Sequence, residues 1–162
     1  MSDRILVAGV GNIFLGDDGF GVEVARRLAG EELPPGASVC DFGIRGLHLA
    51  YQLLDGVDTL ILIDALERGE PPGTLYIFEP DPAPASAEVL FDAHGADPAS
   101  VLAMVRQLGG SLGRAIVVGC EPGEIVERIG LSEPVELAVD EAVQLVRRLV
   151  TKQSLREDDR SC

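Results

Sequence analysis

The sequence predicts an α/β fold: a three-layer sandwich in which a mostly parallel sheet is covered by helices on both faces. Short apolar runs alternate with amphipathic segments along most of the 162 residues, which is typical of strands joined by crossover helices. The most apolar run, Thr59–Ile63 (TLILI), shows no alternation of polar and apolar residues, as expected of a strand covered on both faces. This pattern also predicts where a ligand binds, namely beyond the carboxyl ends of the strands.

The first half of the chain contains two strand–helix pairs. Arg4–Val10 (RILVAGV) is apolar and ends in glycine-rich sequence, which predicts a buried strand. Phe20–Leu28 repeats apolar residues at helical spacing and predicts an amphipathic helix. Ser38–Phe42 is predicted to be a second strand. Leu47–Leu54 is predicted to be a short helix closed by Asp55-Gly56.

The second half continues the pattern after the central strand at Thr59–Ile63. A Pro-Pro-Gly turn at 71–73 precedes a predicted strand at Thr74–Phe78. Pro98–Leu108 is a predicted helix with proline in its first turn, and Ala115–Gly119 is the last predicted strand. Val135–Val150 predicts the final helix. Residues 1–150 are thus expected to form one domain, followed by a polar, disordered tail over 151–162.

Composition excludes several classes of function. Twenty-seven acidic and 13 basic residues give a net charge of −14, which disfavours binding to nucleic-acid phosphates or to an anionic membrane. No apolar run is long enough to span a membrane, and the first residues show no signal-peptide pattern. The three widely spaced cysteines include no CxxC pair, which disfavours a disulfide scaffold and a thiolate zinc site. We therefore expect a reduced, cytoplasmic protein.

The first glycine-rich loop, Gly9–Gly21, contains two adjacent acids, Asp17 and Asp18. The GxG at its start suggests a dinucleotide fold, but Phe14 stands where the fingerprint requires a third glycine. Either acid could cap the helix that follows, although capping does not account for two acids among five glycines. The glycines allow tight turns and the close approach of another molecule.

Asp64 and His94 complete a candidate site with Asp18. Asp64 follows the central strand directly, and His94 lies in a loop before the Pro98 helix. The three residues come from different loops on the same predicted rim. Two carboxylates and an imidazole suit a divalent metal ion with open positions for substrate, and they equally suit a base and an orienting group for a water nucleophile.

Four further residues have simpler interpretations. Arg45 could pair with Asp41 at the end of the second strand, and His48 is expected on the surface or packed in a short helix. Cys120 could form a Cys–His pair with His94, but a cysteine at a strand end is more often a small core residue.

Four segments, in this order along the chain, resemble the hydrogenase maturation proteases: GVGNIFLGDDGFGVEVARRL, LILIDAL, FDAHG and VVGCEPGEIVERIGLSEPVELAVDEAVQLV. The resemblance runs from about Arg4 to Val150. It implies a twisted, mixed sheet between helices, in agreement with the fold predicted above. It also implies that Asp18, Asp64 and His94 contact nickel and carry the catalysis.

The resemblance further implies an aspartyl protease-like hydrolase. Its partner would be the large-subunit precursor of a nickel–iron hydrogenase, from which it removes a short C-terminal peptide. Nickel would arrive bound to the precursor and act as a recognition handle, so it would not be a permanent cofactor of the enzyme. The DFGIRG segment (41–46) departs from the family's DGGT-like stretch and leaves a role in substrate discrimination open. Two other functions remain open: a nickel-binding chaperone without hydrolysis, and a nucleotide-binding regulator.

Overall fold

A computed structural model describes residues 4–80, 98–110 and 112–160. All nine predicted helices and strands are present, with ends within a few residues of prediction except in the last helix. The strands are β1 Ile5–Val10, β2 Ala37–Gly43, β3 Thr59–Ala65, β4 Leu75–Phe78 and β5 Arg114–Cys120. The helices are the 3₁₀ turn η1 Gly16–Gly19, α1 Phe20–Ala29, α2 Gly46–Leu53, α4 Pro98–Gln107 and α5 Glu133–Arg160.

The five strands form one mixed sheet in the order β2-β1-β3-β5-β4. β1, β2, β3 and β5 are parallel, while β4 pairs antiparallel with β5. Only residues 66–74 separate β3 from β4, so β4 begins at the edge where β3 ends and runs back along β5. The predicted α/β class and mostly parallel sheet are confirmed.

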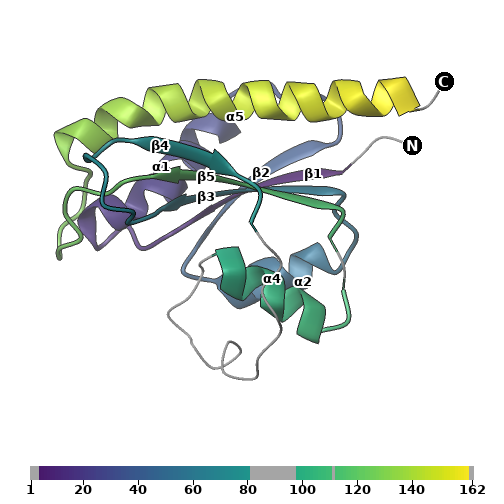
Figure 1. Ribbon diagram of the computed structural model, residues 1–162, viewed down its shortest axis with the longest axis horizontal. Helices are drawn as coiled ribbons and strands as arrows, with labels where there is room; N and C mark the ends of the chain where they lie inside the picture. Colours follow the sequence, from purple (N-terminus) through teal and green to yellow (C-terminus); the bar gives the residue numbers. More distant parts are fainter. Residues whose placement is uncertain (1–3, 81–97, 111, 161–162) are drawn as a thin grey trace.

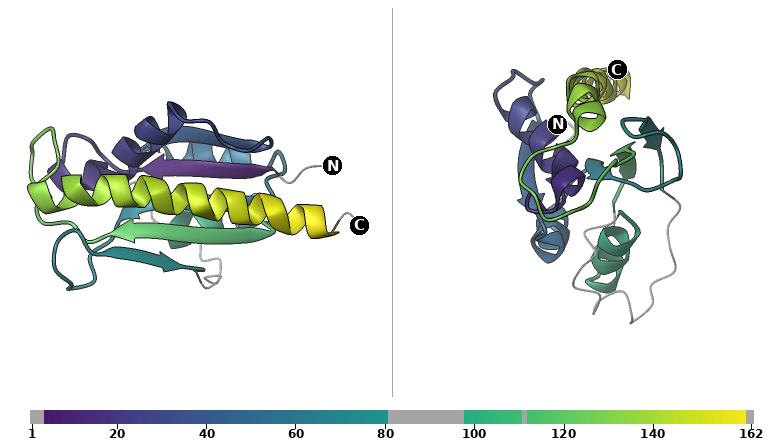
Figure 2. Two further views of the ribbon diagram at one scale, coloured as in Figure 1. Left: turned by 90° about the horizontal axis from the view of Figure 1, so that it is seen from above. Right: turned by 90° about the vertical axis from the view of Figure 1, so that its left-hand side faces the viewer.

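Helices cover both faces of the sheet, and each face has its own apolar core (Figures 1 and 2). Ile5 and Val7 of β1 point to the face covered by α1 and α5, whereas Leu6 and Ala8 point to the face covered by α2 and α4. This alternation follows from the two-residue period of a strand. It explains why β1 and β3 are apolar throughout.

The last helix is longer than predicted. α5 continues through Arg160, so residues 151–160 are helical where the sequence predicted a disordered tail. This stretch contains no glycine or proline, and Gln153 is buried. Nη1 of Arg114 donates to Oε1 of Gln153 at 3.2 Å, which ties the extension to β5. A polar composition therefore did not indicate disorder here, because the buried Gln153 amide, bonded to Arg114 of β5, holds the helix against the sheet.

Candidate active site

The parallel strands end at one rim of the sheet, where the sequence predicted the site. In Figure 2 the arrowheads of β1 and β5 point to the end of the molecule opposite the two termini. The loops that follow β1, β2, β3 and β5 all start at this rim. The described residues contain no helix that is long and apolar enough to cross a membrane.

The glycines of the first loop are required by close packing. A Cβ on Gly21 would overlap the carbonyl oxygen of Ile63, and a Cβ on Gly11 would overlap that of Asp18. α1 and η1 therefore lie directly on the ends of the strands. This packing accounts for the glycine-rich pattern without a bound nucleotide.

Asp17 and Asp18, although adjacent, have different surroundings. Neither side chain caps α1, whose N-cap is Gly19, so the capping interpretation is wrong for both. Asp17 is fully buried. Its Oδ2 accepts hydrogen bonds from the backbone N–H groups of Gly123 (2.7 Å) and Glu124 (2.9 Å) and from the Ser132 hydroxyl (2.7 Å). Its Oδ1 accepts the Ser132 backbone N–H at 2.6 Å.

Burial by itself raises the pKa of Asp17, but the hydrogen bonds from Ser132, Glu124 and Gly123 outweigh it and lower the pKa below the ordinary value. Asp17 is therefore an ionised structural carboxylate. It fastens the first loop to the segment 123–132, more than a hundred residues further along the chain.

Asp18 is only half-buried and faces a less crowded environment. Its Oδ2 accepts the backbone N–H of Asn12 at 2.8 Å, and its Oδ1 accepts no hydrogen bond from the residues that the structure describes. One oxygen thus orients the carboxylate, and the other remains able to accept a proton or contact a cation.

Asp64 lies at the same rim. It is the second-last residue of β3 and is 8% exposed, and its Oδ1 accepts the N–H of Ala65 at 2.8 Å. η1, which carries Asp18, packs against β3. The structure therefore brings the elements that carry the two predicted carboxylates into contact.

The third predicted residue, His94, lies outside the described residues. Within residues 4–80, 98–110 and 112–160, no group of three metal-ligating side chains occurs. The pair Asp18 and Asp64 can supply oxygen ligands but needs further donors to complete a metal site.

Glu121 is a buried carboxylate to which the sequence gave no role. Its Oε1 accepts the backbone N–H groups of Arg68 (2.8 Å) and Glu70 (3.1 Å) and the hydroxyl of Tyr76 (2.7 Å). The bond from Tyr76, aided by the backbone bonds, lowers the pKa of Glu121. Desolvation together with this bond raises the pKa of Tyr76 to about 12. Glu121 holds the loop that follows Asp64 against β4. In the sequence, Glu121 follows a predicted strand just as Asp64 does, and this shared position is the signal that could have marked Glu121 as a candidate.

Cys120 is a core thiol, as favoured by the sequence. It is completely buried in the core beneath α5, and burial together with the nearby Asp17 charge raises its pKa to about 12. A thiol with this pKa is protonated at neutral pH and is a poor nucleophile.

The Asp41 carboxylate does not pair with Arg45. Instead Arg45 donates from Nε and Nη2 to the backbone carbonyls of Phe42 and Asp41, both at 3.0 Å. The Asp41 carboxylate lies 3.6 Å from Nε of Arg26. The expected ion pair is therefore wrong, because Arg45 folds back over its own turn.

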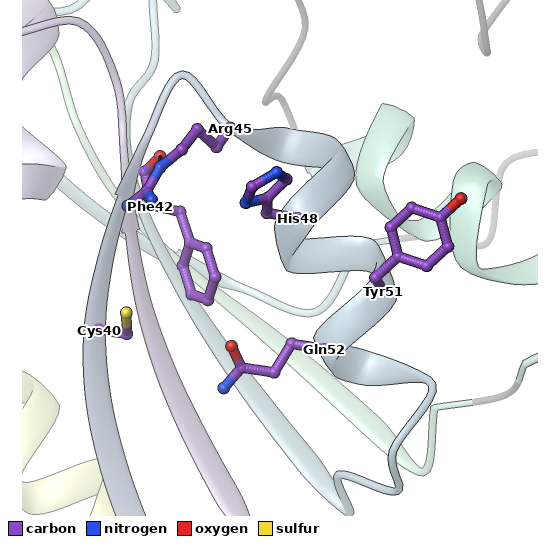
Figure 3. A pocket seen from close by; sticks show the side chains of 6 residues that line it. All are labelled: Cys40, Phe42, Arg45, His48, Tyr51 and Gln52. Carbon is purple, nitrogen blue, oxygen red and sulfur yellow. Dashed lines mark hydrogen bonds between the residues drawn. The ribbon is translucent and has the colours of Figure 1, made fainter.

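A pocket of about 440 Å³ lies between β2 and α2 (Figure 3). Its lining residues are Cys40, Phe42, Arg45, His48, Tyr51 and Gln52. His48 is exposed on α2, as expected for a surface histidine. The lining includes a guanidinium and an imidazole and no carboxylate, so this pocket favours neutral or anionic groups in a strongly acidic protein.

Comparison with known proteins assigns the family. The family model described as hydrogenase maturation protease matches residues 22–149, which is most of the chain. The chain belongs to the hydrogenase maturation protease family. It is 34% identical to a putative hydrogenase maturation protease of Methanocaldococcus jannaschii, over 88% of this chain and 93% of the relative. It is 32% identical to the hydrogenase 2 maturation protease of Escherichia coli, over 88% of each chain.

The fold agrees with the assignment. The hydrogenase maturating endopeptidase HybD from E. coli superposes with a TM-score of 0.75 at 31% identity, covering 92% of this chain and 93% of HybD. As a hydrogenase maturation protease, the protein is a hydrolase, and the resemblance of its motifs to this family is confirmed.

Proposed function

We propose that this maturation protease removes a short C-terminal peptide from the nickel-loaded large-subunit precursor of a nickel–iron hydrogenase. The observation that carries the proposal is the meeting of η1 and β3 at the rim, which gives this family member two carboxylates, Asp18 and Asp64, on elements that pack together. Membership of the family supports the substrate class.

Asp18 and Asp64 are proposed to contact the nickel that the precursor carries, together with His94. The role of His94 rests on the family resemblance. Carboxylate and imidazole groups without the precursor's thiolates make an incomplete nickel site, so the protease is expected to bind nickel weakly alone. The metal is thus part of the substrate, and its contact with the two carboxylates places the scissile peptide bond at the rim.

The chain's own side chains also limit how the peptide bond is attacked. Cys120 is buried and its pKa is about 12, so a thiolate attack from this residue is disfavoured. We propose that water is the nucleophile and that a rim carboxylate accepts its proton. Asp18 is suited to this, since its Oδ1 accepts no hydrogen bond from the described residues.

The pocket beside β2 is proposed to discriminate between clients. Arg45 is the N-cap residue of α2, shortly after the end of β2, and the nearby Gly43 carbonyl accepts the N–H of Gly11 at 2.9 Å. Gly11 in turn packs on the backbone of Asp18. A polar or anionic part of the client can therefore occupy the pocket while its cleavage site lies at the rim.

The test is a mass-spectrometric assay of nickel-loaded precursor incubated with the purified protease. Wild-type protein should shorten the precursor at its C-terminus, while Asp18→Asn and Asp64→Asn should not. Asp55→Asn is the matched control, because Asp55 is exposed and its carbonyl binds Arg4 at the opposite end of β1. Cleavage of a metal-free precursor at the wild-type rate would refute the role of nickel as a handle.

A further inference from the structure

Four large apolar side chains are exposed on two neighbouring loops at the rim. We call them the rim ridge: Phe14 (61% exposed), Ile125 (41%), Val126 (47%) and Ile129 (73%). Exposed apolar residues are ordinary when scattered, whereas a cluster on one face marks an interaction site. The two loops are joined by backbone bonds from Arg128 N to Phe14 O (3.0 Å) and from Gly16 N to Arg128 O (2.8 Å). The four exposed residues therefore lie on two loops that are held side by side.

Hydrogen bonds of Asp17 hold the two loops of the rim ridge together. The buried Asp17 carboxylate accepts four hydrogen bonds from the segment 123–132, and the backbone N–H of Asp17 donates to Glu124 O at 3.0 Å. A carboxylate is costly to bury unless it is satisfied, so this junction holds the two loops in one arrangement. A surface with fixed geometry loses little entropy when a partner binds to it.

The rim ridge adjoins the candidate active site. Phe14 precedes Asp18 by four residues, and the N–H of Asp18 donates to Leu15 O at 3.2 Å within the same turn. Figure 2 shows the loop before α1 and the loop before α5 at the same end of the sheet, where β1 and β5 finish. A protein bound to the ridge would thus have its chain close to Asp18.

The border of the rim ridge is acidic. Glu124, Glu127 and Glu133 are exposed in or just after the second loop. The cation in that loop, Arg128, pairs with Glu124 at 3.3 Å. The complementary partner surface is apolar at its centre and carries lysine or arginine at its edge.

We propose that the rim ridge is the docking surface for the folded body of the precursor, through an apolar patch bordered by basic side chains. This inference rests on the proposed function, since it deepens the recognition of the same client. The ridge would bind the body of the client, and the rim carboxylates would act on its C-terminal segment.

The test measures the affinity of full-length precursor for protease variants, together with KM and kcat for its cleavage. Phe14→Ser and Ile129→Ser should each raise Kd and KM on the order of tenfold and leave kcat unchanged. Leu155→Ser is the matched control, an equally exposed apolar side chain on α5 near the opposite end of the molecule, and should stay within about twofold of wild type. Ile129→Lys should weaken binding more than Ile129→Glu, because lysine opposes a basic border.

The outcomes separate this inference from the proposed function. Wild-type Kd and KM in the ridge variants, with cleavage intact, would overturn the docking surface alone. If wild type binds the precursor without cutting it, and the ridge variants bind it more weakly, the docking surface would be supported and the proposed cleavage refuted. Absence of binding by wild type would overturn both. A wild-type dimer that the ridge variants dissociate would overturn the proposed occupant, because a second copy would cover the ridge.

Discussion

Replacing Asp17 with asparagine should destabilise the fold, whereas the same change at its neighbour Asp18 should not. The introduced asparagine would keep the shape of the side chain and lose its charge. All four groups that face Asp17 are donors in the structure, from Gly123, Glu124 and Ser132. An amide can present its oxygen to only one side. Its NH₂ group would then face at least one buried N–H.

The magnitude follows from these contacts. The best orientation places the amide oxygen at the position of Oδ2, which keeps three bonds but makes them neutral, and it orphans the backbone N–H of Ser132. A buried donor without a partner costs about 1–3 kcal/mol, and charged hydrogen bonds are roughly twice as strong as neutral ones. Relief from burying a charge offsets part of this loss. We expect Asp17→Asn to lower the free energy of unfolding by about 2–4 kcal/mol, or Tm by roughly 4–16 °C.

The effect should depend on pH with a defined sign. The pKa of Asp17 is lower in the folded protein than its ordinary value of 3.8, so its contribution to stability is complete above that value. The contribution is lost as pH falls through the folded pKa. The stability difference between wild type and Asp17→Asn should therefore be constant near pH 7 and shrink below about pH 4.

Urea unfolding at pH 7 and at pH 3 measures both quantities. Asp18→Asn is the control and should change stability by no more than about 0.5 kcal/mol, because the asparagine oxygen can still accept the N–H of Asn12. At a temperature where both variants are folded and precursor is saturating, Asp17→Asn should still cleave and Asp18→Asn should not. Equal stability of Asp17→Asn and wild type would refute the assignment of Asp17 as a structural carboxylate.

Three further predictions concern single positions. Cys120→Ala should retain processing and lower the free energy of unfolding by about 1 kcal/mol. In the wild-type protein, iodoacetamide at pH 8 should label the half-buried Cys40 well before Cys120. A folded but inactive Cys120→Ala protein would revive a thiol mechanism. Gly21→Ala should cost about 2 kcal/mol or more in urea unfolding, whereas Gly56→Ala, which meets no atom within 4 Å, should be limited to backbone strain of about 1 kcal/mol. Gln153→Ala should lower stability by about 1 kcal/mol through loss of the bond from Arg114, and an unchanged value would show that this contact does not anchor the end of α5.

The sequence by itself determined the layered fold and the edge of the sheet that carries Asp18 and Asp64. Apolar runs such as Thr59–Ile63 can be buried on both faces only inside a sheet covered by helices, so the fold class follows from the hydrophobic pattern. Parallel strands joined by helices end at one rim, so Asp18 and Asp64 could be placed there from chain order alone. The order of motifs likewise carried the family resemblance, which the family model confirms.

Only the tertiary structure showed why Asp17 and Asp18 differ in their surroundings. Adjacent residues share the same local sequence, and the difference arises from Gly123, Glu124 and Ser132, which reach Asp17 from the far end of the chain. The role of Glu121 has the same origin, since its partners lie in the loop after β3 and on β4. The length of α5 depends on Gln153 meeting Arg114 of β5. Each of these features depends on hydrogen bonds between segments that are distant in sequence. The local hydrophobic pattern does not indicate which distant donors will face a given side chain.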